Sequence, residues 1–153
     1  MTKKKDHLQS VEDKVLRAAA RLFRAKGFKA ATVRDIARAA NMLPGSLHYR
    51  YPSKTALLVA LMERGVEEAT KAVRAAIDGT RDPVERVRLG LRAHLRLLLS
   101  GDDAVYVLLN EWRALEGRAR ESVIRVRDRY EALFGTVCST KRPGRGGCVR
   151  RWI

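Results

Sequence analysis

Two prolines, Pro44 and Pro52, constrain the fold most because they confine the segment between them to a helix of about two turns. Pro44 suits the first turn of a helix, where its missing N–H leaves no hydrogen bond unmade. Tyr51 precedes Pro52, and a residue before proline is driven out of the helical region. The sequence therefore predicts a short helix over residues 44–50, with Leu47 and Tyr51 packed inward because they lie four residues apart.

A second short helix is predicted directly before this one. Thr32 followed by Asp35 is a typical capping pattern, in which the hydroxyl group of the first residue accepts from the backbone of the third residue after it. Ile36 and Ala37 are expected to face inward, and the helix extends only to about Asn41. Asparagine tolerates the left-handed backbone that a tight turn between helices requires. A helix, a tight turn and a helix result.

Longer helices are predicted on both sides of this unit. Ser10 and Asp13 form a capping pattern for a first helix that ends at Gly27, a residue type favoured after helix ends. Ser53 is expected to cap a long helix whose apolar stripe continues to Ile77. The long helix would connect the helix-turn-helix head to the rest of the chain.

The remainder of the chain also has helical periodicity. Asp82, Pro83 and Glu85 supply a cap, a first-turn proline and an early acidic residue. The apolar residues that this helix carries are Val84, Val87, Leu91, Leu95, Leu98 and Leu99. Two further helical stretches are predicted over residues 104–115 and 118–134. No stretch has the alternation typical of a strand, so the predicted fold class is all-α.

The distribution of charge favours a polyanionic partner. The formal net charge is +15, most of the excess lies in residues 1–60, and residues 61–134 are nearly neutral. A basic head on a neutral body indicates contact with phosphates, because neutralising them releases counterions. A solvated basic surface is the alternative explanation of the charge alone.

Other classes of protein are not indicated. No apolar run is long enough to cross a bilayer and no signal peptide is recognised, so we expect a cytoplasmic protein with no membrane partner. Cys138 and Cys148 lack metal-ligand spacing, so neither a zinc site nor another cofactor is expected. Paired carboxylates, nucleophile–base pairs and phosphate-binding loops are absent, and the sequence therefore predicts that the chain is not an enzyme.

The stretch TVRDIARAANMLPGSLHYRYPSKTALL, residues 32–58, resembles the DNA-binding head of the TetR family of bacterial regulators. With the helix before it, the resemblance covers residues 10–62. It implies a repressor released by a small-molecule effector, with a DNA-binding domain over residues 1–55 and a helical ligand-binding and dimerisation body over 56–134. Residues 135–153 depart from the family and are predicted to form an atypical basic tail. It also implies a homodimer on a palindromic double-stranded operator. The alternative is an architectural protein that binds DNA nonspecifically and has no effector.

The resemblance assigns residues to two kinds of DNA contact. The residues implied at base edges or beside them in the major groove are Arg34, Pro44, Gly45, Ser46 and His48. The residues implied to hold phosphates are Thr32, Tyr49, Arg50 and Lys54. A small residue at the reading helix allows close approach, and an exposed arginine can make a bidentate contact with guanine.

Leu43 departs from the family pattern, which has a polar residue at this position. The substitution removes a side-chain cap from the reading helix. A leucine can instead contact the methyl group of thymine, so we expect a biased base preference near this residue.

The body contains candidates for a ligand pocket of apolar side chains with a few polar anchors. They are Leu91, His94, Leu95, Leu98, Leu108, Glu111, Trp112, Leu115 and Tyr130. Ordinary core packing is an equal alternative for each of them. Residues 110–113 and 127–131 resemble family members that sense acyl-CoA thioesters, which implies a small apolar or acyl-CoA-like effector.

The composition changes abruptly at Gly135, after which Gly, Arg and Cys replace Ala, Leu and Glu. Such a change is what a slipped reading frame or a truncation produces, and we expect an incomplete body that lacks the two further helices with which family members pair. A genuine basic tail that adds nonspecific phosphate contacts is the alternative.

Overall fold

The computed structural model describes residues 2–138 and confirms the predicted all-α fold, since this range contains helices and no strand. The elements are α1 (Thr2–Ala30), α2 (Val33–Ala39), α3 (Pro44–Arg50), α4 (Lys54–Ile77), α5 (Pro83–Leu98), α6 (Asp103–Asn110), a 3-10 turn (Trp112–Ala114) and α7 (Gly117–Cys138).

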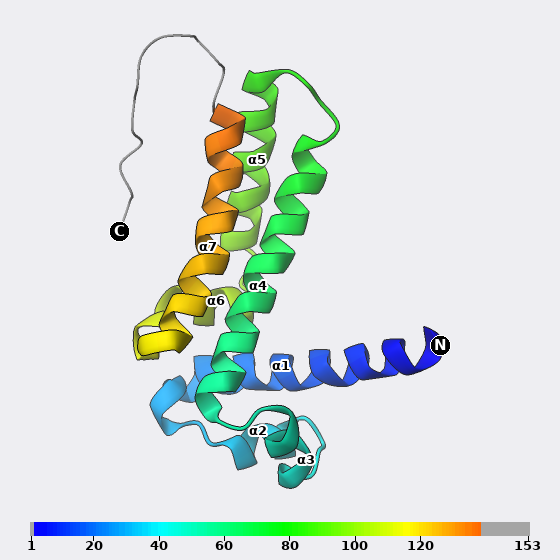
Figure 1. The fold of residues 1–153 in the computed structure, drawn as a ribbon, viewed down its shortest axis with the longest axis vertical. Coiled ribbons are helices and arrows are strands. Elements are labelled where there is room, and N and C mark those ends of the chain that lie inside the picture. Colours follow the sequence, from blue (N-terminus) through cyan, green and yellow to red (C-terminus); the bar gives the residue numbers. More distant parts are fainter. Residues whose placement is uncertain (1, 139–153) are drawn as a thin grey trace.

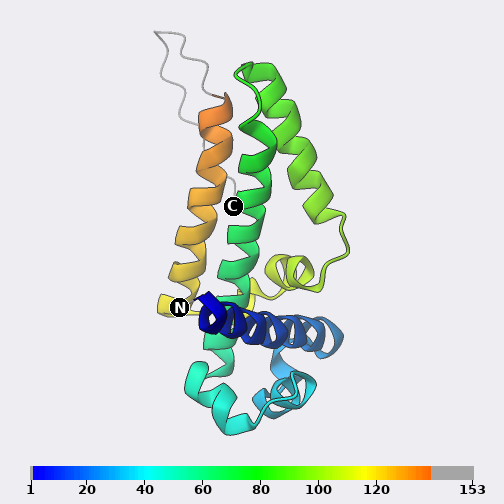
Figure 2. The same ribbon diagram turned by 90° about the vertical axis from the view of Figure 1, so that its right-hand side faces the viewer.

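The helices form a small head below an elongated body. Helix α1 crosses the lower end of α4, and α2 and α3 lie beneath α1 (Figure 1). Helices α4, α5 and α7 make up the body, and α4 alone runs through both parts (Figures 1 and 2). Helix α5 diverges from α4 toward the head, and α6 lies where they part (Figure 2). The long fourth helix thus connects head and body, as predicted.

The predicted caps of the inner helices are confirmed. The Thr32 hydroxyl oxygen accepts from the backbone N–H of Asp35, and the Ser53 hydroxyl oxygen accepts from that of Ala56. Asp82 caps α5 by accepting from the N–H of Val84, with Pro83 in the first turn. These signals are local, so the sequence is sufficient to place them.

The predicted start of the first helix is wrong. Helix α1 begins at Thr2, and Ser10 therefore lies inside the helix instead of capping it. Residues 2–9 contain neither proline nor glycine, so nothing in this segment interrupts the helix. Gly27 interrupts the helix as predicted, with φ of 76°, and a last turn continues to Ala30.

One apolar core joins the head to the lower body. Phe23 of α1, Ile36 of α2, Leu47 of α3 and Leu58 of α4 are all fully buried in this cluster. Val107 of α6 belongs to the same cluster, as do residues at the start of α7. Helix α6 therefore packs directly against α1 of the head, while α7 packs against α4.

Helix α5 buries a glycine and leaves most of its large apolar residues exposed. The buried residue is Gly90, where an added Cβ atom would lie within 4 Å of Val73 and Ile77 of α4 and of Phe134 of α7. The apolar residues Val84, Leu91, Leu95, Leu98 and Leu99 are exposed, with Leu95 53% and Leu99 83% accessible, and Val87 is half-buried. Periodicity identified the helix, but the glycine decides which face approaches its neighbours.

The last helices differ from the predicted ranges at their ends. The predicted stretch 104–115 is α6 followed by the 3-10 turn, and Asp102 caps it by accepting from the N–H of Ala104. Helix α7 passes the predicted end at Phe134 and reaches Cys138. The rest of the predicted tail, residues 139–153 with Cys148, lies outside the described residues. Among the described residues, none of the helices combines the length and apolarity needed to span a membrane.

Candidate nucleic-acid interface and ligand cavity

The reading unit consists of α2, a tight turn and α3. Asn41 forms the turn with φ of 55°, which confirms the left-handed backbone expected there. Pro44 occupies the first turn of α3, and Tyr51 ends the helix in an extended conformation. The seven residues of α3 are thus held between two fixed points of the backbone.

Helix α3 has one buried side and one exposed side. Leu47 is completely buried and Tyr51 is 8% accessible, so both predicted core residues face inward. The Tyr51 hydroxyl group donates to Oε1 of Glu12 at 3.4 Å, and burial, followed by the charge of Glu12, raises the pKa of Tyr51 to about 12. This phenol therefore remains a neutral donor that ties α3 to α1.

The opposite side of the reading unit is open to solvent. The predicted DNA contacts that the structure leaves exposed are Thr32, Arg34, Leu43, Pro44, Gly45, Ser46, His48 and Tyr49. Tyr49 is 94% accessible and Leu43 76%, so both side chains are free to contact a partner. Leu43 is the N-cap of α3 and makes no side-chain capping hydrogen bond, as expected from its departure from the family pattern. A Cβ atom added to Gly45 would meet nothing within 4 Å, so the surroundings of this glycine are open.

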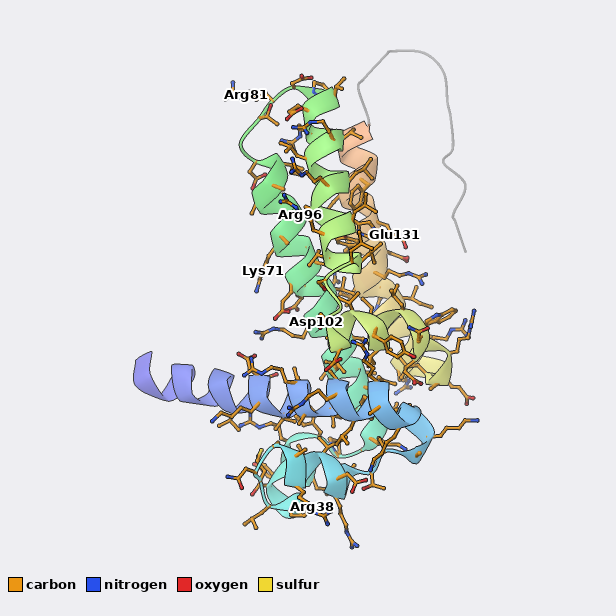
Figure 3. All side chains as sticks on the ribbon, turned by 180° about the vertical axis from the view of Figure 1, so that it is seen from behind. Arg38, Lys71, Arg81, Arg96, Asp102 and Glu131 are labelled. Carbon is orange, nitrogen blue, oxygen red and sulfur yellow. The ribbon has the colours of Figure 1, made fainter. Side chains whose placement is uncertain are left out.

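The N-terminus of α2 is fixed by a reciprocal cap. Hydrogen bonding from Thr32 lowers the pKa of Asp35, and the charges of Lys26 and Arg38 lower it further. Lys26 Nζ lies 3.8 Å from a carboxylate oxygen of Asp35, which connects α1 to α2. Arg38, which sequence reasoning did not include among the contacts, is exposed on α2 at the end of the molecule away from the body (Figure 3).

Two of the predicted phosphate ligands are only partly accessible. Arg50 is half-buried beside Tyr51 at the end of α3. Lys54 is also half-buried, and its ammonium group donates to backbone carbonyl oxygens at the end of α1. The structure thus gives Lys54 partners inside the protein that its spacing in the sequence did not indicate.

The body contains an apolar cavity of about 870 Å³ between α4, α5, α6 and α7. Of the predicted pocket residues, those that line it are Leu91, His94, Leu98, Leu108, Trp112, Leu115 and Tyr130. Leu95 and Glu111 do not line it. Leu95 points to solvent from α5, and Glu111 lies near the Gly27 backbone of α1 instead. Lining residues that sequence reasoning missed include Val87, Leu97, Arg120, Ile124, Arg127 and Phe134.

A small polar group interrupts the apolar wall of the cavity. His94 Nδ1 lies 2.6 Å from the Tyr130 hydroxyl oxygen, and both rings lie against Phe134. Arg127 Nε is enclosed and lies 3.3 Å from a carboxylate oxygen of Glu131. Because most of the exposed surface of the wall is apolar, the cavity favours a ligand that is mostly apolar.

Comparison with known proteins identifies the family. Residues 15–61 match the model described as bacterial regulatory proteins of the tetR family, and residues 80–141 match a tetracyclin repressor-like C-terminal domain. The chain belongs to the TetR family, whose members are DNA-binding transcriptional regulators. Regulators of this family are generally not enzymes.

Individual relatives are longer than this chain. The HTH-type transcriptional repressor KstR2 of Mycobacterium tuberculosis is 28% identical over 124 residues, which cover 81% of this chain and 62% of the relative. The KstR2 of Mycolicibacterium smegmatis is 32% identical over 78 residues, or 51% of this chain and 38% of the relative. The chain thus spans less than two thirds of the length of these repressors.

Solved structures share the fold. The superantigen PfiT is 36% identical with a TM-score of 0.78, and the match covers 84% of this chain and 69% of that one. AibR, solved in complex with isovaleryl coenzyme A and operator DNA, is 26% identical with a TM-score of 0.74 over 83% of this chain and 69% of that one.

Proposed function

We propose that this chain is a repressor that reads operator DNA with α2 and α3. The observation that carries the proposal is the two-sided character of α3, in which Leu47 is buried while Ser46, His48 and Tyr49 project into solvent. A helix that exposes hydrogen-bonding and aromatic groups, beside a surplus of positive charge, suits the major groove of DNA.

The contacts proposed are those implied by the family resemblance, with the exception of Lys54. The residues that would read base edges are Arg34, Pro44, Gly45, Ser46 and His48. Thr32, Tyr49 and Arg50 would hold phosphates. Two copies of the head are needed to read a palindromic operator, so the functional state we propose on DNA is a homodimer.

We further propose that a small effector in the cavity releases the DNA. Helix α6 supports this because it touches both the cavity and the head. Leu108 and Leu109 line the cavity, whereas Val107 is buried in the core shared with the head. Displacement of α6 by a ligand would therefore shift α1, and an effector that binds the displaced state better lowers DNA affinity.

A second contact with α1, at the start of α6, supports the proposed coupling between the cavity and the head. Arg24 Nη1 donates to the carbonyl oxygen of Gly101 at 2.7 Å and to Oδ1 of Asp103 at 2.9 Å, and its guanidinium group lies 5.2 Å from the centroid of the Tyr106 ring. The labelled Asp102 in Figure 3 marks this junction between α5, α6 and α1.

The proposed effector class is an acyl-CoA-like molecule whose apolar part fills the cavity. The apolar wall and the volume of about 870 Å³ support an acyl group, and AibR is a structural neighbour solved with isovaleryl coenzyme A. The His94 and Tyr130 pair would offer hydrogen bonds to the thioester end.

Selection of bound sites from random DNA tests the reading function. A regulator should prefer its selected palindrome over random DNA by about a thousandfold or more at physiological salt, whereas an architectural protein should show no such preference. Ser46→Ala and His48→Ala should each reduce this preference by roughly 1 to 3 kcal/mol. Lys71→Ala, an exposed change on the body (Figure 3), is the matched control and should leave it unchanged.

Binding of acyl-CoA thioesters of increasing chain length tests the effector, with free coenzyme A as the control ligand. Leu91→Arg places a charge in the cavity wall, while Leu95→Arg places the same charge on the same helix outside the cavity. Both positions are about half exposed, so both variants should fold. The proposed site is correct if only Leu91→Arg abolishes the thermal shift that the thioester produces; equal losses in both variants contradict it.

A further inference from the structure

The ammonium group of Lys54 is occupied inside the protein. Its Nζ donates to the carbonyl oxygens of Phe28 at 2.6 Å, Lys29 at 2.9 Å and Ala31 at 3.0 Å. A lysine ammonium group carries three N–H donors, so these three acceptors use all of them. Hydrogen bonds that involve a charged donor are stronger than neutral ones, which makes this arrangement costly to break.

An aromatic ring covers the same cation. Lys54 Nζ lies 4.6 Å from the centroid of the Phe28 ring, and that ring packs against Phe23, with 5.4 Å between the ring centroids. Phe23 is fully buried in the core of the head. The ring therefore attracts the cation to a fixed part of the protein, and a partly desolvated cation gains most from such a contact.

The Lys54 contacts connect two segments that are far apart in the chain. The three carbonyl groups lie immediately after the kink at Gly27, where the last carbonyls of a helix lack partners within it. They precede α2, while Lys54 begins α4 directly after α3. The contacts thus join the two ends of the segment that contains the whole reading unit, residues 32–53.

We propose that Lys54 is a positioning residue for DNA reading: it holds the helix-turn-helix against α1 and α4 and does not neutralise a phosphate. The inference rests on the proposed DNA-binding function. It replaces the phosphate role implied by the family resemblance, because a phosphate would have to compete with three internal acceptors for the same three donors. Lys54 acts through Thr32, since the carbonyl group of Ala31 lies directly before that helix cap.

The test uses Lys54→Met in the full chain, because methionine keeps an unbranched stem against Phe28 but has no donors. We expect affinity for the selected site to fall about tenfold or more, with the slope of log affinity against log salt unchanged. Arg50→Met is the matched control, since loss of one phosphate contact lowers that slope by about one. A salt slope reports phosphate contacts, so a loss of stability alone does not move it.

A second measurement needs no DNA. Hydrogen exchange of the backbone amides of residues 33–36 should accelerate in Lys54→Met and stay unchanged in Lys71→Met, an exposed lysine change elsewhere on α4. Suppose that the wild-type protein shows no preference for any DNA site, while exchange still accelerates in Lys54→Met. The proposed DNA-reading function is then wrong, but the positioning of α2 by Lys54 is supported. If Lys54→Met lowers the salt slope by about one and leaves exchange unchanged, Lys54 is a phosphate ligand and the inference is overturned.

Lys54→Arg provides a second test that does not depend on the folding of the methionine variant. Arginine retains the positive charge, but its planar donors do not match three carbonyl groups around one nitrogen atom. A positioning role predicts weaker binding with the full salt slope. A phosphate role predicts binding like that of wild type, which would overturn the inference.

Discussion

His94 Nδ1 and the Tyr130 hydroxyl oxygen lie 2.6 Å apart where α5 faces α7. Burial raises the pKa of Tyr130 to about 12, so the phenol stays protonated at neutral pH. Burial also lowers the pKa of His94 from its ordinary 6.5. The pair is therefore a neutral imidazole beside a neutral phenol. Protonation of the His94 imidazole lowers the stability of the folded state.

This relationship predicts a loss of stability in mild acid. Because the folded-state pKa of His94 lies below that of the unfolded chain, the unfolded chain binds more protons as pH falls below 6.5. The free energy of unfolding, measured with urea, should be full above pH 6.5 and decrease as pH falls toward the lowered pKa. His94→Gln cannot titrate and should show a shallower decrease. Parallel pH curves for the two proteins would contradict the assignment.

Gly90→Val should destabilise the body. A Cβ atom added at this position would lie 3.4 Å from Ile77 Cγ2 and 3.6 Å from Phe134 Cε1, so the two further methyl groups of valine would crowd these side chains. We expect a loss of about 1 to 3 kcal/mol in the free energy of unfolding. Gly65→Val is the matched control, since this other helical glycine has nothing within 4 Å of its Cβ position. Thermal unfolding of both variants checks the prediction, and equal losses would contradict it.

The sequence was most informative where the cause of structure is local. Thr32, Asn41 and Pro44 fix caps and a turn through their own backbone and side-chain chemistry, and each does so as predicted. It was least informative where distant residues decide the outcome. Leu95 has the spacing of a core residue, yet Gly90 is the residue that allows α5 to approach α4.

In the candidate site, too, local features could be predicted and contacts between distant residues could not. The exposed side of α3 could be predicted because the burial of Leu47 and Tyr51 determines it. The partners of Lys54 could not be predicted, because they lie 23 to 26 residues earlier in the chain. They are also backbone carbonyl groups, which every residue has, so no residue type marks them in the sequence.

Leu43→Ser should change base preference near the start of α3. Leu43 is 76% accessible and caps no backbone group, so serine would add a missing cap and remove an apolar contact. We expect a weaker preference for thymine at one position of the half-site, together with slightly higher stability of the head. Site selection with both proteins checks this, and identical selected sites would count against a thymine contact.

Arg24→Ala should weaken communication between effector and DNA. The ion pair with Asp103 is partly exposed to solvent, so its loss should change the free energy of unfolding by only about 1 kcal/mol or less. Removal of the link between α1 and α6 should nevertheless reduce the factor by which an acyl-CoA thioester lowers DNA affinity. DNA affinities measured with and without the thioester give this factor for each protein. An unchanged factor would place the communication elsewhere.

The shortness of α3 limits how much a single head can recognise. Seven residues extend about 10 Å, which matches about three base-pair steps of DNA. A word of three base pairs recurs by chance about once in 64 positions, while a genome offers on the order of a million or more competing positions. For the function proposed here, one such helix therefore carries too little information to find a single promoter, and this is why the proposal includes a second head at a fixed spacing.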